Sequence, residues 1–354
     1  MKRILIFLGL FAMYGCSSAE QTNSGGTDDT PTNNSSPWSI PVAEVLDGGP
    51  GKDGIPALDN PELITADQTE VLQNNDLVLA FKNGDEVRAY PHIILDWHEI
   101  INDNIGDVSM AVTFCPLTGT GIGWGRMLEG TETTFGVSGL LYNTNLIPYD
   151  RQTDSNWSQI LNESVNGTLI GRKPELYQLL ETNWGTLKQM FPEVRVVSTD
   201  TGFSRTYGVS PYGNYNTDHE FFLFPVDKDP RLPSKEKVLA ILNGNRAKAY
   251  QFSDFETDNI LRDLYGGNEL LLVGNQNFIT VFALVEDTVN LEFEYAFAAG
   301  NGAIVLTDNE GNEWNVFGEA VSGPRQGGRL GQVDAMMAQW FSIPAFYQTQ
   351  LYSE

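Results

Sequence analysis

The chain has two cysteines, and one of them, Cys115, stands inside the segment VTFCPLTGTG. Cys115 ends a β-type run, and Pro116 has no N–H group to continue a sheet, so we expect the thiol at the start of a glycine-containing loop. A thiol in that position reacts as a thiolate when loop N–H groups or an imidazolium lower its pKa. It can also bind a soft metal ion together with imidazole. The alternative is a buried cysteine that serves as a small apolar side chain, and the sequence leaves these roles open.

Three histidines are available as partners for that thiol, and His98 is the leading candidate. If DWHEII and SMAVTFC form a hairpin around NDNIGD, His98 pairs near residue 112, roughly 10 Å along the strands from Cys115. In this register the two side chains point to opposite faces, whereas a one-residue shift or a bulge would place them on one face. The spacing therefore neither supports nor excludes a pair. The predicted catalytic residues are Cys115, His98 and Glu99, and the predicted metal ligands are Cys115 and His98.

The identity of a cofactor stays open, and a copper ion is the candidate that a Cys–His pair favours. His92 and His219 are predicted to be surface or loop residues. The sequence does not decide whether the protein is an enzyme.

The N-terminal segment predicts export and lipid attachment. A short basic start precedes ILIFLGLFAMYG, an apolar run too short to span a bilayer, and Cys16 follows it. The junction MYGC resembles a bacterial lipobox, so we predict a signal peptide over residues 1–16 with Cys16 as the lipidated residue. Residues 17–40 are rich in Ser, Thr, Asn and Gly and are predicted to form a flexible tether. The expected location is the cell envelope, and Ser18 favours the outer membrane.

The charge of the chain argues against two classes of partner. Acidic residues number 46 and basic residues 21, and the formal net charge is −25. Nucleic acid and anionic lipid surfaces both select basic surfaces. We therefore expect no nucleic acid partner, a membrane contact only through the lipid anchor, and an envelope protein or a small ligand as the remaining partner.

The rest of the sequence predicts a mainly β protein with a few short helices, an α+β arrangement. DLVLAFKNGDEVRAYP is typical of a hairpin with Asn83-Gly84 at its turn. Further β-type runs occur at 108–115 and through 269–317. Helical patterns are confined to 173–192 and 333–344.

A repeat divides this β-rich part in two. Residues 78–90 and 238–250 are identical at seven of thirteen positions without a gap, and the flanking segments continue the match in the same order. We predict an internal duplication, with a first copy over 60–225 and a second over 226–354 that packs on the first.

The second copy is predicted to be degenerate. In the alignment Asn275 stands opposite Cys115, and Asp258 stands opposite His98. The second copy keeps the scaffold and lacks the residues that could do chemistry.

Several long blocks of the first copy resemble a bacterial and archaeal family catalogued as domain of unknown function 3179. The blocks are GKDGIPALDNP, AYP with ILDWHEIIND, VTFCPLTGTG, TFGVSGLLYNTNLIPYDRQTDSNWSQ and SPYGNY. The resemblance runs from about residue 48 to 225, and it implies an exported or lipid-anchored protein without a settled activity. The positions that match the two central motifs are His98, Glu99, Asn102, Asp103, Cys115, Pro116, Leu117 and Gly119. The sequence departs at Thr118, where many relatives carry a second cysteine, so a CxxC dithiol is not expected here.

Overall fold

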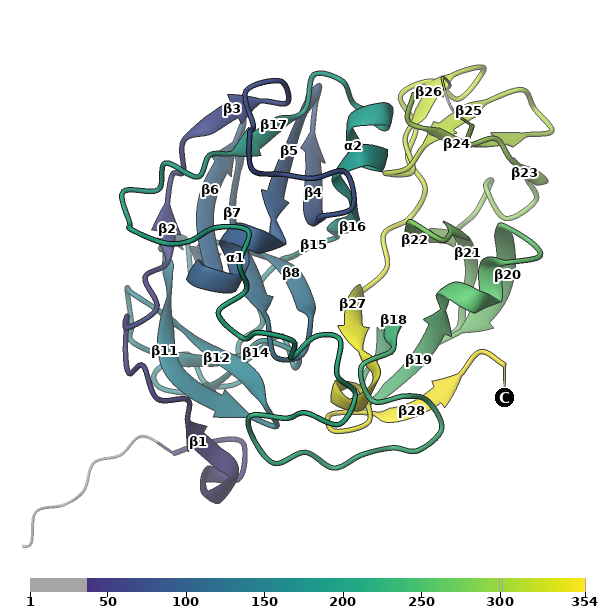
Figure 1. The fold of residues 1–354 in the computed structure, drawn as a ribbon. Coiled ribbons are helices and arrows are strands. Elements are labelled where there is room, and N and C mark those ends of the chain that lie inside the picture. Colours follow the sequence, from purple (N-terminus) through teal and green to yellow (C-terminus); the bar gives the residue numbers. More distant parts are fainter. Residues whose placement is uncertain (1–36, 299, 301, 354) are drawn as a thin grey trace, which may run out of the picture. The chain divides into compact units, whose positions relative to one another are not determined.

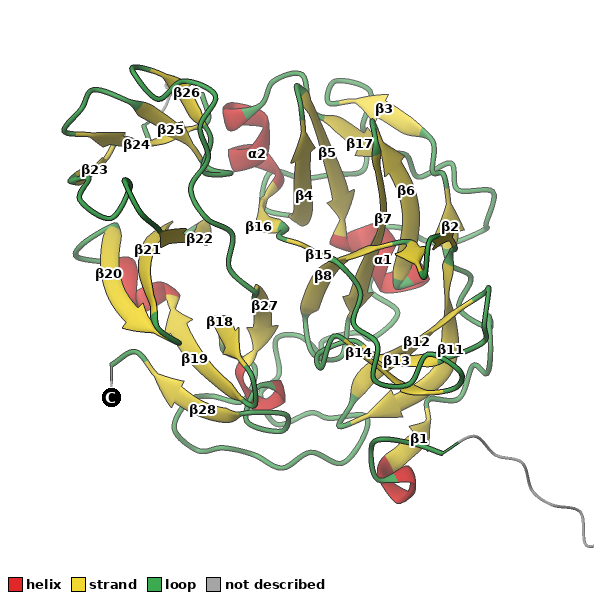
Figure 2. Cartoon of the chain, turned by 180° about the vertical axis from the view of Figure 1, so that it is seen from behind, coloured by secondary structure: helices red, strands yellow, loops and turns green. Residues whose placement is uncertain are grey.

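The computed structural model describes residues 37–298, 300 and 302–353. Strands dominate this part of the chain and helices are few and short, which confirms the predicted mainly β class (Figure 2). None of its helices is long and apolar enough to cross a membrane. The predicted signal peptide, Cys16 and most of the predicted tether lie outside the described residues.

The first half, purple to teal in Figure 1, contains three five-stranded sheets. One sheet has the order β16 (Leu180–Asn183), β4 (Leu77–Asn83), β5 (Glu86–Pro91), β17 (Arg195–Val197), β3 (Leu63–Thr65). The next has the order β15 (Leu176–Tyr177), β8 (Thr120–Gly125), β7 (Val108–Cys115), β6 (Ile100–Ile105), β2 (Leu58–Asp59). The third has the order β1 (Val45–Asp47), β11 (Phe135–Tyr142), β12 (Asn145–Asp150), β13 (Asn156–Ser158), β14 (Glu163–Asn166). The remaining elements are η1 (Val42–Glu44), α1 (His92–His98), β9 (Met127–Leu128), β10 (Thr131–Glu132) and α2 (Trp184–Met190).

The second half, green to yellow in Figure 1, contains three smaller sheets. The first has the order β27 (Ala335–Gln339), β18 (Lys237–Asn243), β19 (Arg246–Gln251), β28 (Gln348–Leu351). The second has the order β20 (Ile260–Tyr265), β21 (Asn268–Asn275), β22 (Phe278–Leu284). The third has the order β23 (Phe293–Tyr295), β24 (Ile304–Asp308), β25 (Glu313–Asn315), β26 (Ala320–Ser322). Two 3-10 helices complete it, η2 (Phe252–Phe255) and η3 (Trp340–Ser342).

The two halves share one order of strand pairing. In the first half β16 and β4 are antiparallel, β4 and β5 are antiparallel, and β5 and β17 are parallel. In the second half β27 and β18, then β18 and β19, are antiparallel, and β19 and β28 are parallel. The turns match as well, because Asn83 pairs with Glu86 and Asn243 pairs with Arg246. These pairings support the predicted repeat, while descent from a duplicated unit stays a prediction.

The match extends to buried side chains. The Asp103 carboxylate accepts hydrogen bonds from Arg88 (2.6 Å) and from the Tyr90 hydroxyl (2.8 Å). In the second half Lys248 and Tyr250 both donate to Asp263, each at 2.5 Å. Each half thus ties two successive strands, β5 to β6 and β19 to β20, through a basic residue, a tyrosine and an aspartate.

We expect Tyr90→Phe and Tyr250→Phe to lower the free energy of unfolding by similar amounts, about 1–2 kcal/mol each, because each leaves a largely buried carboxylate short of one donor. Urea unfolding of the two variants measures this. A cost confined to one half would contradict the equivalence of the two triads.

The halves share their hydrophobic cores. One cluster joins Cys115 and Leu117 of the first half to Val238 and Trp340 of the second. Polar contacts cross the same boundary, since Lys237 donates to the Gly119 carbonyl (2.9 Å). Because buried apolar contacts carry most of the folding free energy, we expect the described region to unfold in one step.

Three sequence predictions need correction. Residues 173–192 are helical only over α2, because their first part forms β15 and β16. Residues 333–344 form strand β27 and the short η3 in place of a helix. Residues 92–98 form α1, where the predicted hairpin required a strand. In the first two cases the apolar run pairs with a distant strand, and sheet pairing overrides local helix preference.

The segment between β17 and β18, residues 198–236, crosses in front of α1 and then follows the lower edge of the molecule in Figure 1. We call it the covering segment. It contains no helix or strand, although every residue of it is described. Loops of this length are uncommon in compact domains and usually serve a function.

Candidate functional site

Cys115 is the last residue of β7, as the sequence predicts, and only 1% of its surface is exposed. Its Sγ lies 3.8 Å from the carbonyl oxygen of Thr144, at the turn between β11 and β12. Backbone hydrogen bonds from Thr118 and Leu146 also act on the sulfur. Of these two residues, Thr118 belongs to the predicted loop after Cys115, whereas Leu146 belongs to β12.

Burial nonetheless raises the pKa of the Cys115 thiol to about 11, and the nearby Glu99 adds to the increase. The hydrogen bonds from Thr118 and Leu146 lower the pKa, but by less. With Cys115 buried as it is here, the sulfur is therefore a neutral thiol at pH 7.

Glu99 follows directly on α1 and is the group that the fold brings to the thiol. The hairpin β6–β7 pairs Ile100 with Thr113, and the Phe114 amide donates to the Glu99 carbonyl (2.7 Å). Ile101 faces residue 112, where His98 was predicted, so the predicted register is wrong by three residues. Glu99 has a φ of 57°, and this left-handed conformation turns the chain from helix to strand at some cost in free energy.

Two carboxyl groups lie here, one buried (Glu99) and one largely buried (Asp96). Burial raises the pKa of Glu99 to about 7, against a hydrogen bond from the Tyr212 hydroxyl at 3.3 Å. Burial likewise raises the pKa of Asp96, on α1, to about 7, against a hydrogen bond from Ser210. Near neutral pH each group is divided between its protonated and ionised forms, which suits proton transfer.

His98 is occupied by other partners. Its Nδ1 lies 2.7 Å from the Pro56 carbonyl, to which it must donate, and its Nε2 lies 2.7 Å from the Tyr207 hydroxyl. Burial lowers the pKa of the imidazole, so the ring is neutral. Neither ring nitrogen is free to serve Cys115 as base or to join it at a metal ion.

The other histidines differ from each other. His92 starts α1 with its side chain largely buried, its Nε2 3.5 Å from a Glu181 carboxylate oxygen, and burial lowers its pKa to about 4. The prediction of a surface or loop position is wrong for His92. His219 lies in the covering segment, and its Nδ1 accepts from the Lys235 amide (3.1 Å).

The described residues contain no group of three or more His, Cys, Asp or Glu side chains that could hold a metal ion. A copper ion at Cys115 and His98 stays a prediction, and the geometry lends it no support.

The covering segment closes the site. Tyr212 packs against the core cluster that contains Cys115, and Tyr215 is fully buried in it. The Tyr215 hydroxyl is buried without a hydrogen-bond partner, and the proximity of Cys115 contributes to raising its pKa. An unsatisfied buried hydroxyl costs free energy, and it offers a donor to a bound ligand or water.

Backbone strain gathers at the same place. Asn143 and Thr144 form the tight turn between β11 and β12, with φ values of 47° and 65°. A β-branched residue such as Thr is rarely found in this conformation. The strained Thr144 is the residue whose carbonyl contacts the thiol.

The sequence blocks that carry the family resemblance therefore meet around one thiol, although they are spread from residue 48 to 225. The family model for "Protein of unknown function (DUF3179)" matches residues 52–350. The chain belongs to this family. The match extends well beyond residue 225, so both halves are parts of the family's fold. No curated protein and no solved structure matches the chain.

Sequence reasoning missed several residues of the site, namely Asp96, Thr144, Tyr212 and Tyr215 as neighbours of Cys115 and Glu99. The block SPYGNY, which contains Tyr212 and Tyr215, was the one sequence feature that could have indicated their place in the site. The segment between it and β7 is too long for its contacts to be predicted from spacing.

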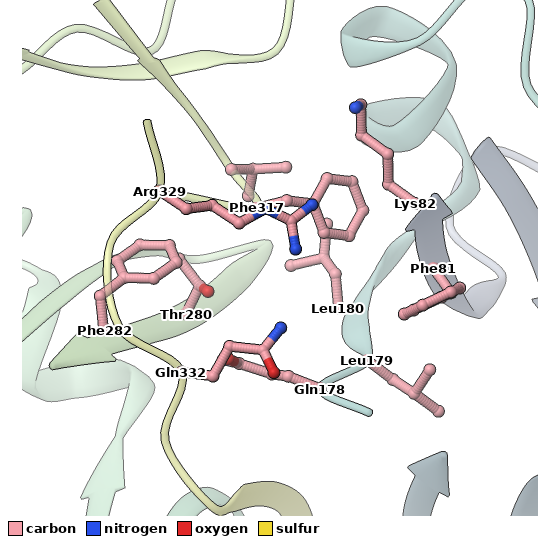
Figure 3. Close-up of a pocket in the computed structure, with 11 residues that line it drawn as sticks. Phe81, Lys82, Gln178, Leu179, Leu180, Thr280, Phe282, Phe317, Arg329 and Gln332 are labelled. Carbon is pink, nitrogen blue, oxygen red and sulfur yellow. The ribbon is translucent and has the colours of Figure 1, made fainter. Parts of the chain in front are cut away.

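A cleft between the halves lies away from this site. Figure 3 shows Arg329 and Gln332 of the second half facing Leu180 and Gln178 of the first. Its volume of about 20 Å³ holds little more than one water molecule. We therefore regard this cleft as a packing crevice.

Proposed function

We propose that the protein is a lipid-anchored protein of the cell envelope, favouring the outer membrane, whose first half binds a small ligand at Cys115 and acts on it through the thiol. The lipobox-like MYGC junction and the polar tether support the anchor. Three groups support the site: the buried Cys115 thiol, the Glu99 carboxyl group with its pKa near 7, and the Tyr215 hydroxyl, which has no hydrogen-bond partner.

The chemistry follows from the pair Cys115 and Glu99. When Glu99 is ionised, its carboxylate can accept the thiol proton, and the N–H groups of Thr118 and Leu146 stabilise the resulting thiolate. Burial is the largest cause of the raised thiol pKa. Movement of the covering segment would remove that cause and keep the N–H donors.

The pH dependence of alkylation tests this role. In the full chain carrying Cys16→Ser, Cys115 is the single thiol, and its rate with iodoacetamide should rise with an inflection near pH 7, the pKa of Glu99. Glu99→Gln should slow the reaction at pH 7.5 by about tenfold, because it removes the base. Glu256→Gln is the control, since Glu256 is an exposed residue of the second half and is no cause of the pKa shift of either Glu99 or the thiol.

The sign of the effect is decisive. A carboxylate that acts only through its charge raises the thiol pKa, so its removal by Glu99→Gln would speed alkylation. Faster reaction of that variant would refute the proton-transfer role. Labelling only in denaturant would show a buried structural cysteine and refute the proposed function.

A further inference from the structure

A cavity of about 360 Å³ lies at the β11–β12 turn, whose Thr144 contacts the Cys115 sulfur. This volume lies in the range of small-ligand sites. Four separate parts of the chain line it: η1–β1, the β11–β12 turn, the covering segment, and η3 with the residues that follow it. The residues used below are Glu44, Leu46, Thr144, Pro225, Asp227 and Phe341.

One residue separates the cavity from the sulfur. Thr144 lines the cavity, and its carbonyl oxygen is 3.8 Å from the Cys115 Sγ. The Thr144 hydroxyl donates to the carbonyl of Pro225 in the covering segment (3.3 Å). The side-chain amide of Asn143 donates to the Ala345 carbonyl (3.0 Å). A change at this strained turn, coupled to the covering segment, would open the cavity to the thiol.

The charge of the cavity is of one sign. Its ionisable lining residues are Glu44 and Asp227, and none of the described lining residues is Lys, Arg or His. The nearest basic residue in the sequence, Lys228, pairs with Glu220 at 2.5 Å. Leu46, Pro225 and Phe341 supply apolar wall.

We infer that this cavity is the entrance to Cys115 and that it admits a small ligand with a cationic amine beside an apolar group. The inference rests on the proposed thiol function and adds the route and the class of ligand. Two carboxylates at the mouth raise the local concentration of cations and repel anions, and the apolar wall holds the body of the ligand.

Two thiol reagents of opposite charge test it in the Cys16→Ser chain. The rate of each reagent with Cys115 is divided by its rate with free 2-mercaptoethanol, because the cationic reagent is intrinsically the faster, and the rates compared below are these normalised rates. The probes are 2-(trimethylammonium)ethyl methanethiosulfonate and 2-sulfonatoethyl methanethiosulfonate. In each case the Cys115 thiolate attacks the sulfenyl sulfur, forms a mixed disulfide and releases methanesulfinate, while Glu99 takes the thiol proton. The cationic reagent should react at least tenfold faster at low salt, and the ratio should shrink in 0.5 M salt.

The double variant Glu44→Gln, Asp227→Asn should bring the ratio of the two rates close to one. The double variant Glu256→Gln, Asp258→Asn removes the same charge from exposed residues of the second half and should leave the ratio unchanged. Equal rates of the two reagents with the unchanged cavity would overturn the inference. Failure of both reagents to label the native chain would instead overturn the proposed function.

Discussion

Glu99→Gln should make the protein more stable at pH 8 than the parent chain and change its stability at pH 5 far less. Burial raises the pKa of Glu99 from 4.5 to about 7. Above pH 7 the folded protein must hold a buried charge that the unfolded chain exposes to water. A carboxyl group with a raised pKa therefore contributes stability that is present at acidic pH and is lost as the pH rises through 7.

The expected gain at pH 8 is about 2 kcal/mol, less than the full pKa shift implies, because the folded protein relaxes around a buried charge and lowers its cost. The amide oxygen of glutamine still accepts from Tyr212, so the packing is kept. Urea unfolding at pH 5 and pH 8 gives the result, with the exposed Glu256→Gln as control. Parallel pH dependence of the parent and Glu99→Gln chains would show that Glu99 is not the buried acid described above.

Acidic conditions should destabilise the protein through a different residue. Burial lowers the pKa of His92 from 6.5 to about 4. The folded state therefore disfavours its protonation, and stability is lost as the pH falls from 6.5 through 4. Glu99→Gln leaves this acidic decline in place, and so the two causes can be separated.

The strands were predictable where local chemistry decides them. Asn83-Gly84 specifies a tight turn wherever it lies, and the repeat of that hairpin at Asn243-Gly244 is visible in the sequence. Residues 92–98 were not predictable in the same way. His98 and Glu99 are adjacent in the sequence, yet the positive φ of Glu99 sends their side chains to different partners.

Only some residues of the candidate site could be singled out from the sequence, and their pairing could not. The sequence singled out Cys115, His98 and Glu99. The fold brings Glu99 close to Cys115 and gives His98 other partners. The different surroundings of His98 and Glu99 depend on two tyrosines of the covering segment. Tyr207 binds His98, and Tyr212 binds Glu99. Contacts made by a loop of this length follow from the whole fold and not from local spacing.

The second half shows what the same scaffold does without the thiol. Asn275 ends β21 as Cys115 ends β7. Its side chain accepts from the Asn277 amide (2.7 Å) and donates to the Tyr295 hydroxyl (2.9 Å). The position is used there to hold a turn, which agrees with a structural role for the second half.

Lys235→Met should raise the rate at which Cys115 is alkylated in the native protein by about tenfold or more. Lys235 is 5% exposed and its ammonium group donates to two carbonyls of the covering segment, those of Tyr215 and Phe221. It also lies 3.4 Å from the centre of the Tyr215 ring. Methionine fills similar space but leaves both carbonyls without a donor in the closed state.

An unsatisfied buried acceptor costs about 1–3 kcal/mol, and each 1.4 kcal/mol changes an equilibrium tenfold. Lys235→Met therefore shifts the covering segment towards an open form in which water and reagent reach the sulfur. Iodoacetamide labelling at pH 7.5 in the Cys16→Ser chain measures the change. Lys248→Met is the matched control, since Lys248 is also buried but binds Asp263 in the other half. If both variants expose Cys115 equally, the thiol is reached by global unfolding, and the covering segment does not control access to it.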